Sequence, residues 1–288
     1  MDIPIELIIY VFGHLSPPDV LSLVATCRKH YNAWQQHINT IYNLINHTIQ
    51  CEHDARMLLA DQGILPVDSA MTAAGFLQLR RNAHVIEKIA DRFGCEIILP
   101  FCCPLVDPVD YGFYGGGPRP PHLTPTERPR FIRIVYRLWG LFLLNPGEAR
   151  HQRLKRYKMK DLLSLEGIGP GYDPQPIDIV TSVIMAEEKQ PSGLGLTIPK
   201  IDRNISVDEV LDKVRDAVDD AAQYAYGCSR QEFHGWDEGG WWRGPISLVD
   251  DCRPIFKDIL INAEGTGGER LVPVDEVWYD TSDGEIMD

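Results

Sequence analysis

The stretch "IPIELIIYVFGHLSPPDVLSLVATCRKHYNAW" at residues 3–34 decides the interpretation of the fold, because its first helix is apolar on two faces. One stripe has the i, i+3, i+4, i+7 spacing of a face that packs on a core, and it comprises Ile5, Ile8, Ile9 and Phe12. A second stripe lies roughly 100° away around the helix, and it comprises Leu7, Val11 and Leu15. The second stripe predicts either burial inside a large fold or contact with a partner chain.

A second helix is predicted to begin in "SPPD" at residues 16–19. Ser16 suits the N-cap, Pro17 the first helical position and Asp19 the third. The apolar and aromatic residues that follow at helical spacing are Val20, Leu21, Leu23, Val24, Cys27, Tyr31 and Trp34. The helical pattern continues toward residue 40 with one break near Thr26, which predicts three short helices.

This segment resembles an F-box, the short three-helix module of ubiquitin-ligase substrate receptors. The positions that carry the resemblance are Ile3, Pro4, Glu6, Leu7, Ile8, Leu15, Asp19, Leu21, Val24, Cys27, Arg28, Tyr31 and Trp34. The one departure is Ile3, which stands where the family pattern has Leu. The match covers about 40 of 288 residues. Further along, "LTPTERPRFIRIVYRL" is similar to the helical region of fungal F-box proteins.

In this family the module binds a Skp-family adaptor, which joins it to a cullin scaffold. The resemblance therefore implies a substrate-recruiting receptor of a Skp–cullin–F-box ubiquitin ligase, with an unknown protein substrate and no catalysis of its own. A module of about 40 residues rarely buries enough area to be stable alone, which agrees with completion by a partner. The residues expected to contact the adaptor are Ile3, Pro4, Ile5, Leu7, Ile8, Val11, Leu15, Leu21 and Val24. The alternative is that these residues pack only within their own chain.

The whole chain is predicted to be mainly α, with an F-box at residues 1–42 and a larger irregular helical domain at residues 43–288. Further helices are expected at about 43–61, 71–93, 124 onward, 148–163 and 206–227, with Gly94 ending the second of these. Residues 177–185 are the best strand candidate but also suit a helix. "TPTE" and "SVDE" have the pattern of capping boxes. Two Pro/Gly-rich segments, including residues 100–129, are expected to be long loops.

Two other functions stay open at this point. One is an adaptor that pairs with the Skp-family protein outside any ligase, and the other is an enzyme with an unrecognised site in residues 43–288. Sequence motifs do not favour the enzyme, and neither metal nor cofactor is expected. "CEHD" at residues 51–54 has no second ligand pair, Cys102 and Cys103 lack a catalytic signature, and "YGFYGGGP" is not a phosphate-binding loop. His234, Asp237 and Glu238 lie close in sequence without a nucleophile or ligand partner.

Charge is unevenly distributed along the chain. The formal net charge of -13 argues against general nucleic-acid binding. Residues 127–160, however, carry ten Lys or Arg and two Glu, whereas residues 201–288 carry eight Lys or Arg and twenty-one Asp or Glu. One interpretation is mutual neutralisation, in which the basic residues pair with Asp212, Asp216, Asp219 or Asp220. The other is a basic groove that binds an acidic or phosphorylated partner.

Candidate substrate-binding residues follow from the second interpretation and from the aromatic segment at residues 233–245. They are Tyr111, Tyr114, Arg153, Arg156, Trp236, Trp241 and Trp242. The alternative for the tryptophans is that they cover the core beneath a loop. The acidic N-terminus, the absence of a membrane-length apolar run and seven cysteines without a CxxC pair predict a cytoplasmic or nuclear protein with reduced thiols and no membrane contact.

Overall fold

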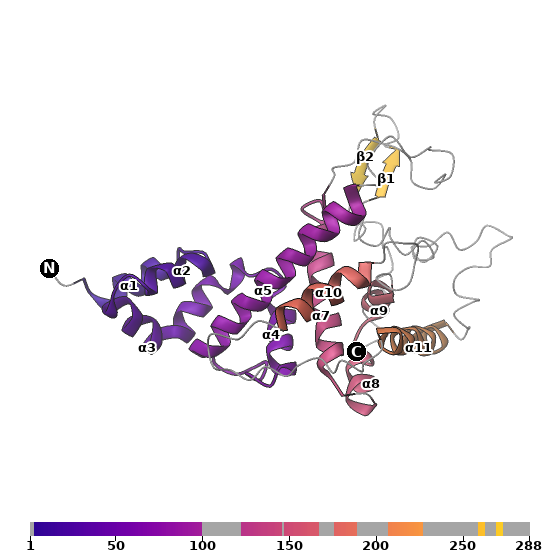
Figure 1. Ribbon diagram of the computed structural model, residues 1–288, viewed down its shortest axis with the longest axis horizontal. Helices are drawn as coiled ribbons and strands as arrows, with labels where there is room; N and C mark the ends of the chain where they lie inside the picture. Colours follow the sequence, from indigo (N-terminus) through magenta and orange to yellow (C-terminus); the bar gives the residue numbers. More distant parts are fainter. Residues whose placement is uncertain are drawn as a thin grey trace.

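A computed structural model describes residues 3–99, 122–145, 147–166, 176–188, 207–226, 259–262 and 269–272. The fold is mainly α, as predicted (Figure 1). The helices of the first half are α1 Ile5–Phe12, α2 Pro17–Val24, α3 Arg28–Ile45, η1 Asn46–Thr48, α4 Glu52–Asp61, α5 Ala73–Phe93 and η2 Gly94–Ile98. Those of the second half are α7 Glu127–Leu143, α8 Glu148–Leu154, α9 Met159–Glu166, α10 Pro176–Glu188 and α11 Val207–Tyr226. Strands β1 Ile259–Asn262 and β2 Glu269–Val272 form an antiparallel pair with Ile259 opposite Val272.

The first three helices form the N-terminal end of the molecule, where α1 and α2 both pack on α3 (Figure 1). Ser16 caps α2 as predicted, because its hydroxyl oxygen accepts a hydrogen bond from the Asp19 amide. Helix α3 has a kink at His37 and runs on to Ile45, past the boundary expected at residue 42. Trp34 and Tyr42 of α3 are buried, so this helix joins the N-terminal helices to the rest of the core.

The helix expected at residues 43–61 is interrupted. After α3 the chain makes the 3-10 turn η1, and Cys51 adopts the left-handed conformation with φ 53° before α4 begins. A left-handed residue cannot continue a right-handed helix. The thiol of Cys51 lies 3.2 Å from the Pro129 carbonyl oxygen, to which it donates. The break thereby places α4 against α7.

Helix α5 ends at Phe93 with Gly94 as its C-cap, as predicted, but the chain does not leave the helical conformation there. Gly94 has right-handed helical angles, φ -56° and ψ -47°, and the chain continues through the π-helical turn η2. Ile97 and Ile98 are buried, so continuing the helix keeps two apolar side chains in the core. At its other end α5 is capped by Thr72, whose hydroxyl accepts from the Gly75 amide at 3.0 Å.

Helix α7 is central to the larger part of the fold. The capping box predicted before it is present, because the Thr124 amide donates to Glu127 Oε2 and the Glu127 amide donates to Thr124 Oγ1. Pro129 lies in the first turn of the helix, where its missing amide hydrogen has no intrahelical acceptor to lose. Phe131 stacks on Phe93 with ring centroids 4.3 Å apart. Helix α7 therefore joins α4 and α5 in one core.

The remaining helices pack around this centre. The basic helix expected at residues 148–163 is two helices, α8 and α9, which Tyr157 and its neighbours separate. The ambiguous segment at residues 177–185 is helix α10, which packs on α5, and the acidic helix α11 packs on α9 and α8. No helix in the described ranges is both long and apolar enough to cross a lipid bilayer.

Candidate functional site

Helix α1 has one buried side and one exposed apolar side, which is the feature that the sequence predicted. Ile8 and Phe12 are buried in the core of the chain. The outer face of α1 is defined here by four exposed apolar residues, Ile3, Leu7, Tyr10 and Val11. Their spacing puts them on the side of the helix away from Ile8 and Phe12. A group of large apolar side chains on one exposed helix face is typical of a protein-binding surface.

Two contacts fix the ends of this outer face. At its start the Lys29 ammonium group of α3 donates to the carbonyl oxygen of Ile3 at 2.7 Å, which holds the segment before α1 against the next helices. At its end the rings of Tyr10 and His14 meet edge to face with centroids 4.5 Å apart. The four apolar side chains are therefore presented by a helix whose opposite side is anchored in the core.

The residues predicted to contact an adaptor divide into three groups. Ile3, Pro4, Leu7 and Val11 are exposed. Three more are half-buried against the core, namely Ile5, Leu15 and Leu21. The prediction of a partner contact is wrong for Ile8 and Val24, because both side chains are buried within their own chain. Tyr10, which the sequence analysis did not name, is also exposed on this face, and its position three residues after Leu7 was a usable signal.

The basic residues predicted to bind substrate have mixed roles. Arg153 forms a two-pronged ion pair with Asp61 of α4, with Nη1 3.0 Å from Oδ2, and Asp61 is buried. The Arg153 guanidinium therefore compensates a buried carboxylate of its own chain, and its binding to a substrate stays a prediction. Arg156 is exposed, and its contact with a substrate stays a prediction. Burial raises the pKa of Asp61, and the Arg153 charge opposes that shift.

The mutual neutralisation expected between the basic segment and the acidic helix occurs through other residues. Buried Arg150 pairs with Glu209 of α11 at 3.4 Å, and burial lowers the pKa of Arg150. The expected partners Asp212 and Asp216 instead pair with Arg215 and Lys213 of their own helix. The i, i+3 spacing within α11 brings these groups together without a second helix.

A second charge network, built around buried Asp54 and half-buried Arg137, holds α4, α7 and α9 together. Arg137 of α7 lies 2.8 Å from Asp54 and 2.6 Å from Asp161. Its guanidinium also lies over the ring of Tyr157, 5.0 Å from the centroid. Burial raises the pKa of Tyr157 to about 12, although Arg153 and Arg137 act in the opposite direction. These basic side chains stabilise helix packing.

Several candidates lie outside the described residues. They are Tyr111, Tyr114, Cys102, Cys103, Trp236, Trp241, Trp242, His234, Asp237 and Glu238, and the capping residue Ser206. The side chain of Asp219 is likewise not described. Within the described part of the chain, no three His, Cys, Asp or Glu side chains are grouped closely enough to hold a metal ion.

Comparison of the chain with protein-family models, with curated proteins and with solved structures finds no match. The function is therefore inferred from the outer face of α1 and from the resemblance of residues 3–34 to an F-box.

Proposed function

We propose that this protein is a substrate-recruiting receptor subunit of a Skp–cullin–F-box ubiquitin ligase. It binds the Skp-family adaptor through the outer face of α1, works in the cytoplasm or nucleus, and uses residues 43–288 to bind a protein substrate. The observation that carries the proposal is the two-sided character of α1. Its inner side contributes Ile8 and Phe12 to the core, while Leu7 and Val11 remain exposed at the position where the sequence resembles the adaptor-binding module.

The size of the exposed apolar surface supports a protein partner. Full burial of an aliphatic or aromatic side chain contributes about 1.5 to 3 kcal/mol, whereas association of two proteins costs roughly 4 to 15 kcal/mol. Four side chains therefore offset much of the cost without exceeding it by a wide margin. The half-buried residues at the edge of this surface, Leu15 and Leu21 among them, are expected to supply the remaining contacts.

The same surface suits a ligase-independent adaptor, which differs from a ligase receptor in lacking the cullin. To separate the two, full-length tagged protein is purified from the cells that express it, and the co-purifying proteins are identified by mass spectrometry. We expect both a Skp-family adaptor and a cullin with the wild type, and neither with the Pro4→Ala/Leu7→Asp double variant. An aspartate at position 7 would place an unpaired carboxylate in an apolar interface.

The control is Leu99→Asp, which makes the same chemical change at an exposed leucine after η2. This variant is expected to retain both partners. Recovery of the adaptor without a cullin supports the ligase-independent function instead. A wild-type protein that brings down no Skp-family adaptor contradicts the proposal.

A further inference from the structure

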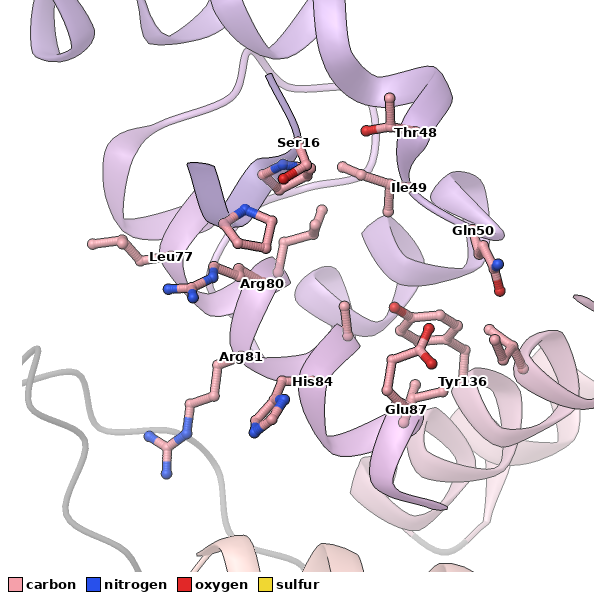
Figure 2. Close-up of a pocket in the computed structure, with 16 residues that line it drawn as sticks. Ser16, Thr48, Ile49, Gln50, Leu77, Arg80, Arg81, His84, Glu87 and Tyr136 are labelled. Atoms are coloured by element: carbon pink, nitrogen blue, oxygen red, sulfur yellow. The ribbon is translucent and has the colours of Figure 1, made fainter. Parts of the chain in front are cut away.

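A pocket lies where the N-terminal helices meet α5 and α7 (Figure 2). Its walls come from four parts of the chain, namely the start of α2, residues 48–50, the outer side of α5 and one side of α7. Its volume is about 620 Å³, which is within the range of small-molecule sites. None of its lining residues belongs to the outer face of α1, so the pocket is a separate feature from the proposed docking surface.

The floor of the pocket is apolar. Its accessible apolar surface comes from Pro17, Pro18, Leu77 and Ala83, and the buried side chains of Ile49, Leu79, Ile86, Ile132 and Tyr136 border it. Burial also raises the pKa of the Tyr136 hydroxyl, so this residue is neutral at physiological pH. The floor therefore suits the apolar body of a ligand.

The rim of the pocket is cationic. Figure 2 shows Arg80, Arg81 and His84 in succession along one side of α5, with Glu87 beside Tyr136 further along. Arg80 and His84 are exposed, and no carboxylate among the described residues pairs with either. The charge of Glu87 is compensated by an ion pair with Arg128 of α7. Arg80 thus gives the rim a positive charge that no described carboxylate compensates, although the whole chain is acidic.

We propose that this pocket binds a small organic anion with an apolar body. The acidic group lies at Arg80 and His84, where a guanidinium supplies paired hydrogen-bond donors for a phosphate or carboxylate. The apolar body lies on Pro17, Leu77 and Ala83, which are half-buried. The exposed hydroxyl of Thr48 and amide of Gln50 provide polar groups at another edge. This inference goes beyond the proposed function and does not depend on it.

The test uses the full-length protein and calorimetric titration with four probes. These are 1-naphthyl phosphate, 2-naphthoate, the uncharged 2-naphthylmethanol and inorganic phosphate. Because the site combines a cationic rim with an apolar floor, at least one naphthyl anion is expected to bind about tenfold or more tightly than either the alcohol or inorganic phosphate. The two naphthyl anions together show whether the rim prefers a phosphate or a carboxylate.

Variants locate the binding. Arg80→Glu/His84→Glu places two carboxylates at exposed positions on the rim and is expected to weaken anion binding about tenfold or more. Ala83→Phe fills the pocket and is expected to remove it, with circular dichroism checking the fold. Lys155→Glu makes a similar charge reversal at an exposed position outside the pocket and is expected to change nothing.

Four results overturn the inference, three from the probes and the rim variant and one from an α1 variant. The first is no binding of either naphthyl anion to the wild type, and the second is equal affinity for the uncharged alcohol. The third is unchanged affinity in the Arg80→Glu/His84→Glu variant. The Leu7→Asp/Val11→Asp variant is expected to bind the anion normally, so loss of binding there would place the probe on the outer face of α1 and would also overturn the inference. An adaptor-binding failure leaves all these outcomes unaffected.

Discussion

Leu7 and Ile8 are neighbours in α1, yet Leu7 is 55 % exposed and Ile8 is 4 % exposed. Ile8 packs inside the N-terminal helices, whereas Leu7 points away from them. Truncation of Ile8 to Ala is therefore expected to cost about 2 to 4 kcal/mol of unfolding free energy, because it leaves a cavity in the core. Leu7→Ala is expected to change it by less than about 0.5 kcal/mol. Urea unfolding of the two variants measures both values, and equal costs would contradict the two-sided assignment.

Gly140 of α7 is expected to tolerate no larger residue. A Cβ at this position would lie 2.5 Å from Oδ2 of Asp61, and the Asp61 carboxylate is held by Arg153. Gly140→Ala should therefore displace a buried ion pair and cost about 1 to 3 kcal/mol in thermal or urea unfolding. Gly94→Ala is the control, because Gly94 has ordinary helical angles and, among the residues that the structure describes, its added Cβ meets only the His122 backbone, at 3.9 Å. A stable Gly140→Ala protein would show that Asp61 can move freely.

Arg153 and Arg156 are expected to differ in their contribution to stability, because Arg153 pairs with Asp61 and Arg156 lies on the surface. Removing Arg153 leaves the carboxylate of Asp61 buried without its charge partner, so Arg153→Ala is expected to cost about 3 to 5 kcal/mol. Arg156→Ala is expected to stay within about 0.5 kcal/mol of the wild type, since Arg156 is exposed. The denaturant midpoints of both variants measure these two losses of stability. A larger loss at Arg156 would reverse these roles.

Ionisation of Tyr157 is expected to reduce the stability of the folded protein at alkaline pH. Its pKa is raised to about 12 in the folded protein from an ordinary value of 10.0, mainly by burial. A raised folded-state pKa contributes stability that is fully present below pH 10 and is lost as the pH rises to about 12. Relative to Tyr157→Phe, the wild type is therefore expected to lose about 2 to 3 kcal/mol over this range. Denaturant unfolding of both proteins from pH 9 to about 12 measures the difference. A stability difference between the two proteins that does not change with pH would contradict the raised pKa of Tyr157.

Local signals in the sequence predicted much of the helical framework. Caps at Ser16 and Thr124 identified the starts of two helices, because a capping residue and its partner lie within three positions of each other. The two stripes of α1 likewise depend only on spacing within one helix. Gly94 as a terminator located the end of α5, but it did not predict the π-helical turn η2 that follows, in which Ile97 and Ile98 are buried.

Contacts between distant segments could not be predicted in the same way. The partner of Arg153 is Asp61, 92 positions away in the sequence, and neither residue carries a local sign of the other. The pocket around Arg80 depends on residues 16–18, 48–50 and α7 meeting over one side of α5. The i, i+4 spacing of Arg80 and His84 was visible in the sequence, but the apolar floor beside them was not.

Binding of the purified full-length protein to a purified Skp-family adaptor tests the central claim most directly. Calorimetric titration compares the wild type with Leu7→Asp/Val11→Asp and with Leu99→Asp. We expect binding by the wild type, an affinity lower by about a hundredfold or more for the α1 variant, since two carboxylates would be buried in an apolar interface, and wild-type affinity for Leu99→Asp. Undiminished binding by the Leu7→Asp/Val11→Asp protein, with its fold confirmed by circular dichroism, would contradict the assignment of the outer face of α1 as the adaptor-binding surface.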